Sequence, residues 1–161
     1  MNYEIRPVEK SDLESIVAIE AAAFDMPIEM TRKDMLGRID NYPDTFLVAA
    51  VDGQVVGHVF GPAAHERYIK DVLYYDNHEN RSADPYQTVL SLAVAEQYRK
   101  NGIATALLDE LSKVAASEHR KAVTLTCLPK LFDFYEKRGF VNEGPTADDI
   151  PEASFNMVKT L

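Results

Sequence analysis

The sequence has few of the residues that build covalent or metal-based frameworks. Tryptophan is absent, and the one cysteine, Cys127, excludes an internal disulfide bond and fits a reducing compartment. His65, His78 and His119 have no spacing that suggests a metal site, so no metal is expected. No apolar stretch reaches the roughly 18 residues that a membrane-spanning helix needs. The first residues also lack the apolar core of a signal peptide, and we therefore expect a cytoplasmic protein with no membrane partner.

Positive charge is scarce as well. Seventeen Lys and Arg residues stand against 26 Asp and Glu, which gives a net charge of −9 at pH 7. Nucleic-acid binding needs a basic face that replaces counterions, so no nucleic-acid partner is expected. The acidic balance is compatible with attraction of cationic substrates, although solubility is the simpler explanation. The 161 residues, 46% of them apolar, predict a single domain over residues 1–161 and leave the oligomeric state open, a homodimer included.

Apolar periodicity predicts an α/β protein. In the first half we expect a strand over 2–7 and a helix that begins at a capping box of Ser11 and Glu14 and ends near Phe24. A second helix over 31–39 begins at a cap pair of Thr31 and Asp34. The Asp52-Gly53 step predicts a hairpin between strands at 46–51 and 54–60, and residues 62–84 form a long surface loop with a short element near 68–75.

The second half is predicted to begin with one central strand over 86–94, because apolar residues occupy both of its faces. A helix follows from Gly102 to about Ser117. A strand over 122–127, a short helix from Pro129, a left-handed terminus at Gly139 and strands over 140–143 and 154–159 complete the chain.

The turn between the central strand and the helix is the first functional signal. Residues 99–105 read Arg-Lys-Asn-Gly-Ile-Ala-Thr. A helix start presents unpaired N–H groups and the positive end of the helix dipole, which together favour phosphate. The segment lacks the Gly-Lys-Ser/Thr ending of a nucleotide-triphosphate loop and the three spaced glycines of a dinucleotide loop. In isolation it would be a plain strand-to-helix turn.

In context, the chain resembles the GNAT acetyltransferase superfamily along essentially its whole length. The acetyl-CoA signature Arg/Gln-x-x-Gly-x-Gly/Ala is matched by residues 99–104, and Leu92-Ala93-Val94 and the run Phe-Tyr-Glu-Lys-Arg-Gly-Phe at 134–140 also match. Within the superfamily, the chain is most similar to the arylalkylamine (serotonin-type) N-acetyltransferases. That similarity is carried by Ala23-Phe24, by Ser91 to Val94, by Cys127 and by Gly144-Pro145.

The resemblance implies a mixed, mostly antiparallel central sheet of about seven strands flanked by about four helices, with a V-shaped splay beside the central strand. It also implies acetyl-CoA as co-substrate. The pyrophosphate would bind the N–H groups at the start of the long helix, and the pantetheine arm would pair with the strand like an added strand. The expected cofactor-binding residues are Leu92, Ala93, Val94, Arg99, Lys100, Asn101, Gly102, Ile103, Ala104 and Thr105.

Acetyl transfer to an amine needs a proton for the departing thiolate, and the resemblance assigns that role to Tyr135. A phenol with a pKa of about 10 is a suitable donor. The alternative is a core aromatic residue, because Tyr135 lies four residues after Leu131 on an apolar helix face. Cys127 is better interpreted as a small apolar strand residue than as a nucleophile.

The general base is where the sequence departs from the resemblance. Arylalkylamine enzymes carry two strand histidines, and the matching positions here are Thr88 and Leu90. A relocated base, a water chain or an amine of lower pKa would serve instead. His58 is one candidate base, although a histidine with only a structural role is the simpler interpretation. The expected acceptor site comprises Phe24, Met26, Pro27, Glu29, Thr88 and Leu90, with Asp25 or Glu29 holding the ammonium group or simply capping a helix.

These inferences predict an enzyme, an acetyl-CoA-dependent N-acetyltransferase acting by direct attack of a small primary amine, arylalkylamine-like or polyamine-like. Two alternatives stay open. One is acetylation of a protein N-terminus or lysine, for which the loop at 62–84 would form or block a groove. The other is an acyl-CoA-binding sensor without turnover, which the missing strand histidines support and Tyr135 opposes.

Overall fold

Residues 1–147 and 154–161 are described by the structure, a computed structural model. The first half contains β1 (Glu4–Pro7), α1 (Leu13–Phe24), α2 (Ile28–Asn41), β2 (Phe46–Val51), β3 (Gln54–Phe60) and β4 (Ala63–Ala64). The second half contains β5 (Tyr86–Thr88), β6 (Ser91–Val94), α3 (Ile103–Ser117), β7 (Ala122–Cys127), α4 (Phe132–Glu136), β8 (Val141–Pro145) and β9 (Phe155–Thr160). No helix in these ranges is long and apolar enough to cross a membrane.

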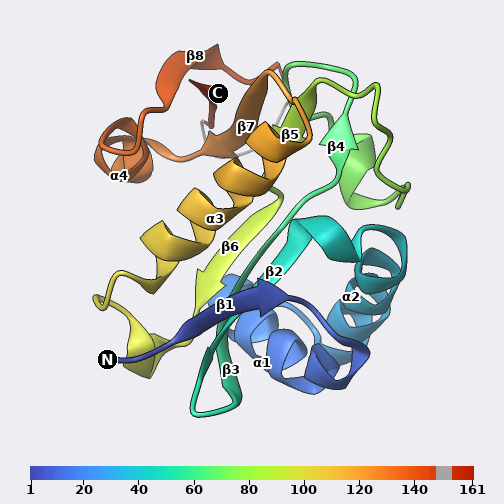
Figure 1. The fold of residues 1–161 in the computed structure, drawn as a ribbon, viewed down its shortest axis with the longest axis vertical. Helices are drawn as coiled ribbons and strands as arrows, with labels where there is room; N and C mark the ends of the chain where they lie inside the picture. Colours follow the sequence, from blue (N-terminus) through green and yellow to red (C-terminus); the bar gives the residue numbers. More distant parts are fainter. Residues whose placement is uncertain (148–153) are drawn as a thin grey trace.

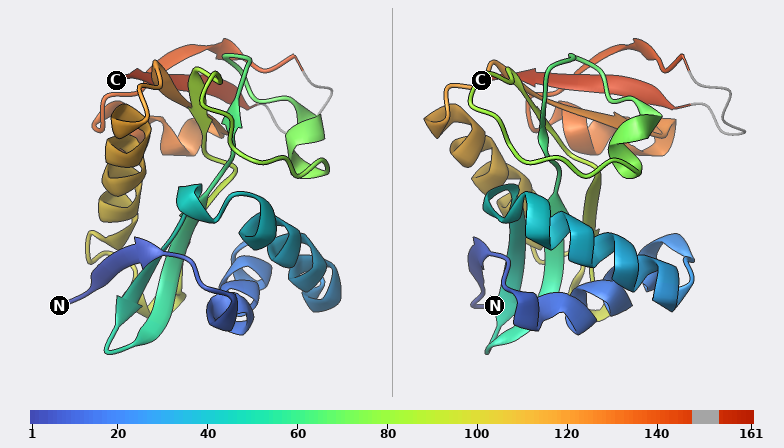
Figure 2. Two further views of the ribbon diagram at one scale, coloured as in Figure 1. Left: turned by 45° about the vertical axis from the view of Figure 1, so that its right-hand side comes forward. Right: turned by 90° about the vertical axis from the view of Figure 1, so that its right-hand side faces the viewer.

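The strands form two sheets, and the chain passes from one sheet to the other between β3 and β4 and again between β5 and β6. One has the order β1-β2-β3-β6 and the other β4-β5-β7-β9-β8, and every neighbouring pair is antiparallel except β5 with β7. Helices α1 and α2 cover one face of the first sheet and α3 covers the other, while α4 lies against the second sheet (Figures 1 and 2). This is the mixed α/β arrangement that the sequence predicts.

The expected single strand over 86–94 is wrong, because the chain changes sheets within it. β5 pairs with β7 as far as Thr88, and the Val89 N–H donates to the Thr124 carbonyl at 2.9 Å. From Ser91 onward the chain pairs with β3 instead. The chain that leaves β3 passes close to the end of β5 at this point. A Cβ on Gly61 would lie 2.2 Å from the Thr88 carbonyl oxygen, so only glycine permits this close approach. Beyond this break β6 and β7 separate, which produces the predicted splay.

Two helix starts also differ from the sequence prediction. A 3-10 turn over Lys10–Asp12 precedes α1, and the capping box consists of Glu9 and Asp12 rather than Ser11 and Glu14. Helix α2 begins three residues earlier than expected, after Pro27, whose φ of −61° suits a helix entry. The Thr31 hydroxyl therefore donates to the Pro27 carbonyl at 2.8 Å from within the helix instead of capping it.

Other local predictions are confirmed. Asp52 and Gly53 have φ values of 50° and 82°, as the two-residue hairpin between β2 and β3 requires. Gly139 has φ 93°, and the Phe140 N–H donates to the Tyr135 carbonyl at 3.1 Å, which ends α4 as a left-handed terminus. The loop predicted over 62–84 contains a 3-10 turn at Asp71–Tyr74, but it is not surface loop throughout, because the buried strand β4 at Ala63–Ala64 lies at its start.

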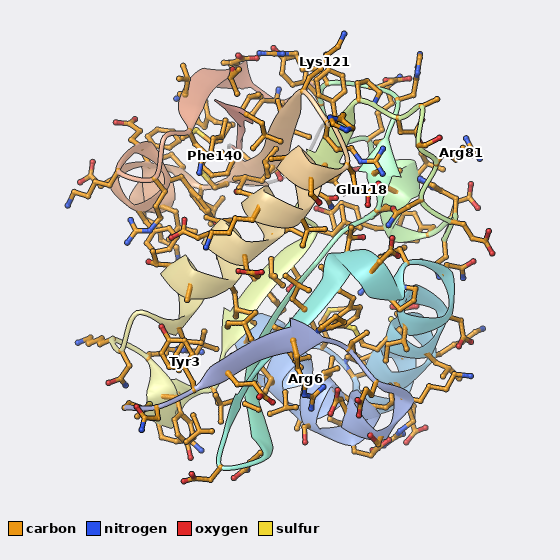
Figure 3. All side chains as sticks on the ribbon, viewed as in Figure 1. Tyr3, Arg6, Arg81, Glu118, Lys121 and Phe140 are labelled. Carbon is orange, nitrogen blue, oxygen red and sulfur yellow. The ribbon has the colours of Figure 1, made fainter. Side chains whose placement is uncertain are left out.

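β1 is attached to the start of α1 by an ion pair between the half-buried Arg6 and the buried Asp12 (Arg6 is labelled in Figure 3). Two guanidinium nitrogens donate to the carboxylate at 2.7 and 2.9 Å. Burial alone would raise the pKa of Asp12, but the bonds from Arg6 and from the Glu9 N–H outweigh it and lower this pKa.

Because the pKa of Asp12 is lowered on folding, its contribution to stability is present above its unfolded pKa of about 3.9 and is lost as the pH falls. Asp12→Asn should therefore cost ~2 kcal/mol of unfolding free energy at pH 7 and less at pH 3, as measured by urea denaturation. Glu4→Gln is the control, because Glu4 is exposed and 3.7 Å from Arg6. An equal cost at both pH values would contradict the prediction.

Candidate active site

A cavity of about 490 Å³ opens on the α3 side of β6, next to the splay. It is bounded by β6, the turn that follows it, the first turn of α3, and α4. Most of the residues predicted to bind a cofactor meet here. The lining consists of Leu92, Val94, Tyr98, Arg99, Lys100, Gly102, Ile103, Ala104, Thr105, Leu131, Phe134, Tyr135 and Arg138.

Two of the predicted cofactor residues do not line this cavity. Ala93 belongs to the apolar cluster beneath α1 and α2, because alternate side chains of a strand point to opposite faces. Asn101 donates its amide to the carbonyls of Tyr98 and Arg99, both at 3.1 Å, and so shapes the turn instead.

The turn before α3 has the kind of backbone that can present N–H groups to an anion. Lys100 and Gly102 both have left-handed backbones, with φ of 66° and 79°. Backbone of this kind at a helix entrance directs successive N–H groups toward one point, and the first N–H groups of α3 have no partner within the helix. A Cβ on Gly102 would meet nothing within 4 Å, so open space lies against the turn. Arg99 contributes differently: its Nε donates to the Val94 carbonyl at 3.0 Å and braces the end of β6.

Arg138 is a residue of this cavity that the sequence prediction missed. Its Nε donates to the Thr105 hydroxyl at 2.9 Å, one Nη donates to the Phe134 carbonyl at 2.6 Å, and the guanidinium lies 3.9 Å from the centre of the Phe134 ring. These contacts fix a positive charge beside the first turn of α3. The signal in the sequence is an arginine four residues after an aromatic residue on a short helix, which is too common to identify a site.

Tyr135 both packs in the core and lines the cavity. A role as a core aromatic residue is therefore compatible with a role as proton donor. Its ring makes edge contacts with Phe134 and Phe140, at centroid distances of 5.0 and 5.6 Å. Burial raises the pKa of Tyr135 to about 12, with a smaller contribution from nearby Cys127. The phenol is therefore protonated at neutral pH. Burial likewise raises the pKa of Cys127 to about 11, which disfavours a thiolate.

A second cavity, of about 380 Å³, lies on the α1 side of β6. Three of the residues predicted for the acceptor site, Phe24, Met26 and Leu90, line it. Pro27 precedes α2 next to this cavity without lining it. The complete lining is Glu20, Phe24, Met26, Thr31, Asp34, Met35, Arg38, Tyr74, Leu90 and Thr126.

Glu29 and Thr88 are placed elsewhere, contrary to the sequence prediction. The Glu29 carboxylate is exposed and accepts a bond from Arg32 at 2.6 Å, because the early start of α2 directs it away from the cavity. Thr88 is fully buried at the strand break, where its hydroxyl donates to the Pro62 carbonyl at 2.6 Å.

Glu20 is the acidic group that the sequence prediction missed. Its Oε1 accepts a bond from the Ser91 hydroxyl at 2.6 Å and lies 2.9 Å from Nε2 of the fully buried His58. Both contacts end on Oε1, so Oε2 has no hydrogen-bond donor among the described residues. His58 is thus not a free base: it positions a carboxylate at the wall of the second cavity. Residues 20, 58 and 91 are too far apart in the sequence for spacing to reveal them.

Comparisons with known proteins agree with this architecture. The model of the acetyltransferase (GNAT) family matches residues 13–140. An uncharacterised N-acetyltransferase of Methanocaldococcus jannaschii is 33% identical over 107 residues, which are 66% of this chain and 55% of that protein, so the chain spans little more than half of that relative's length. An N-alpha-acetyltransferase of Sulfurisphaera tokodaii is 31% identical over 147 residues, which are 86% of this chain and 80% of that protein.

Among solved structures, the GNAT-like decarboxylase GphF in complex with isobutyryl-CoA has a TM-score of 0.81 with this chain, at 17% identity and with 98% of each chain covered. At this level of identity the likeness establishes the fold. Among the residues that the structure describes, no group of three His, Cys, Asp or Glu side chains is arranged to hold a metal ion.

Proposed function

The chain belongs to the acetyltransferase (GNAT) family, and on that premise we propose that it transfers an acetyl group from acetyl-CoA to a primary amine. The observation that carries the proposal is a pair of cavities, one between β6, α3 and α4, and the other between α1, α2 and the strand break that precedes β6. One has an anion-binding helix entrance and a protonated phenol. The other has the half-buried carboxylate of Glu20, one oxygen of which has no hydrogen-bond donor among the described residues. These are the groups that amide formation from a thioester requires.

The first cavity fits the cofactor. The CoA pyrophosphate would bind the N–H groups at the start of α3, with the Arg138 guanidinium adding charge. The pantetheine arm would lie along the outer edge of β6, since β6 pairs with β3 on its other edge. That edge also offers backbone N–H groups to the thioester carbonyl.

The chemical step follows from the two side chains. The acceptor arrives as an ammonium ion, and Glu20 takes one proton from it and passes that proton to solvent. The neutral nitrogen then attacks the thioester carbonyl carbon, the C–N bond forms, and Glu20 takes the second proton that the nitrogen loses. The C–S bond then breaks, and the CoA thiolate takes the hydroxyl proton of Tyr135. Glu20 then releases its proton to solvent, and solvent returns a proton to Tyr135. A carboxylate therefore replaces the strand histidines that the sequence lacks.

The acceptor that the second cavity supports best is a small primary amine. Its volume suits a compact ligand, and Phe24, Met26, Met35 and Leu90 give it apolar walls. Of the two acceptor types expected from the sequence, an arylalkylamine-like body matches these walls better than a polyamine does. Glu20 would hold the amine end.

A protein N-terminus is the second candidate acceptor. It is favoured by the relative from Sulfurisphaera tokodaii, which is named for N-alpha-acetylation and is similar over most of both chains. Phe24, Met26, Ile28 and Met30 are also partly exposed around the α1–α2 junction, where a peptide could lie. An acyl-CoA sensor without turnover is the weakest alternative, because binding alone needs neither a proton acceptor such as Glu20 nor a proton donor such as Tyr135.

Thiol release from acetyl-CoA tests these alternatives. The acceptor panel comprises arylalkylamines, polyamines, peptides with free N-termini, and N-blocked peptides that contain lysine. Release with small amines supports the proposal, and release with peptides alone favours the second candidate. CoA binding without release favours a sensor. No CoA binding at millimolar concentration by folded protein would contradict all three.

Arg138→Gln should weaken CoA binding about tenfold, because it removes a charge-assisted contact to phosphate. Titration calorimetry with CoA measures the effect, which should shrink with added salt. Lys113→Gln, on the exposed part of α3, is the matched control. Unchanged affinity in Arg138→Gln would show that the guanidinium only braces α3 against α4.

A further inference from the structure

Arg38, which lines the second cavity, is a buried cation with no matching anion. It is nine-tenths buried, at 7% exposure. One Nη reaches the Tyr74 carbonyl only at 3.5 Å, the other contacts the Met35 sulfur at 3.9 Å, and Nε has no hydrogen-bond partner. No carboxylate in the described part of the chain forms an ion pair with it.

A buried positive charge in this position is energetically costly unless an anion or another group stabilises it. The face of the Phe60 ring, whose centre is 4.8 Å from the guanidinium carbon, provides some stabilisation. Burying a guanidinium without a carboxylate partner is nevertheless unfavourable. The two acidic groups of the cavity do not pair with it: Glu20 bonds to His58 and Ser91, and Asp34 forms no ion pair among the described residues. The missing partner is therefore expected from the ligand.

We propose that the acceptor of this enzyme carries a carboxylate as well as its amine, so that the substrate class is α-amino acids with apolar side chains. This inference rests on the proposed function and makes it more specific. The amine of the substrate would donate to the free oxygen of Glu20, and its carboxylate would accept two hydrogen bonds from the guanidinium of Arg38. Its side chain would pack against Phe24, Met26 and Leu90.

The arrangement also accounts for discrimination among amines. An amine without a carboxylate leaves the guanidinium unpaired and loses a charge-assisted contact. A polyamine would bring a second positive charge toward Arg38 and be repelled. We therefore expect selection against both classes, made by the charge of Arg38 rather than by the shape of the cavity.

Three acceptors that share one side chain test the proposal: L-phenylalanine, phenylalanine amide and phenethylamine. Thiol release from acetyl-CoA gives kcat/KM for each. L-Phenylalanine should be preferred over both others by about tenfold or more. In Arg38→Met the ratio of kcat/KM for phenylalanine over phenethylamine should fall to near one, and Arg38→Lys should retain part of the preference. Lys33→Met, an exposed position on the same helix, is the control and should keep the wild-type ratio.

A second measurement separates this proposal from the proposed function. Calorimetric titration of L-phenylalanine and phenethylamine into the CoA-bound protein reports carboxylate recognition without turnover. Binding that depends on the carboxylate and on Arg38, with no thiol release, would support this inference and overturn the proposed transfer. Equal kcat/KM and equal binding for all three compounds, or a preference retained in Arg38→Met, would overturn this inference. So would release confined to peptides, which would still leave an N-acetyltransferase.

Discussion

Replacing Tyr135 with phenylalanine should lower kcat by about two orders of magnitude or more while CoA affinity is retained. The change removes the hydroxyl group of the buried phenol that lines the first cavity, and proton donation in the transition state typically contributes that much. The ring keeps its edge contacts with Phe134 and Phe140, and the hydroxyl has no hydrogen bond to any described residue. The fold should therefore be unaffected.

Thiol-release kinetics and CoA calorimetry together check this prediction. Tyr75→Phe is the control, because Tyr75 is highly exposed and lines neither cavity. The wild-type enzyme should also keep its rate at pH values where an ordinary tyrosine ionises, since its pKa of about 12 preserves the donor form until the pH rises through that value. An unchanged kcat in Tyr135→Phe, measured where chemistry limits the rate, would exclude Tyr135 as the acid.

Glu20→Gln should lower kcat/KM by about a hundredfold at neutral pH, with little change in CoA binding. The amide keeps the shape of the side chain and an oxygen for the Ser91 hydroxyl, but it cannot take a proton. The defect should shrink as the pH rises toward the amine's own pKa of about 10, because solvent then supplies the neutral amine. A purely structural role would give a defect that does not depend on pH.

Glu14→Gln provides the matched comparison on the same helix. Glu14 is exposed and pairs with Arg32 at 2.8 Å, away from both cavities. Thermal unfolding of both variants shows whether loss of the Glu20 carboxylate disturbs the buried His58. If kcat/KM in Glu20→Gln equals that of Glu14→Gln at every pH, the base is elsewhere.

Local chemistry explains why much of the fold could be predicted. Three features depend on a left-handed backbone, which glycine adopts readily and which the sequence therefore indicates. They are the Asp52-Gly53 turn, the start of α3 after Gly102 and the termination of α4 at Gly139. The break at residues 89–90 has no such signal. It depends on contact between Gly61 and Thr88 and on the pairing of β5 with β7, both of which form only in the folded chain.

The site divides in the same way. The phosphate turn and Tyr135 belong to contiguous motifs, so the sequence indicates them. Glu20 reads as an ordinary polar residue of an amphipathic helix, and its partners lie 38 and 71 residues away. Arg38 reads as a basic residue in the last turn of α2, a position that favours positive charge in any helix. Only the packing of α1 and α2 against β3 buries both groups at one wall.

The separation of β6 from β7 has a consequence for inhibitor design. The two cavities have no lining residue in common, so each reactant can occupy its place while the other is bound. In the proposed reaction the two reactants meet, so a single molecule in which an acetyl bridge joins the CoA sulfur to the acceptor nitrogen would fill both cavities at once. Its affinity should greatly exceed that of either half, because binding of one half raises the effective concentration of the other.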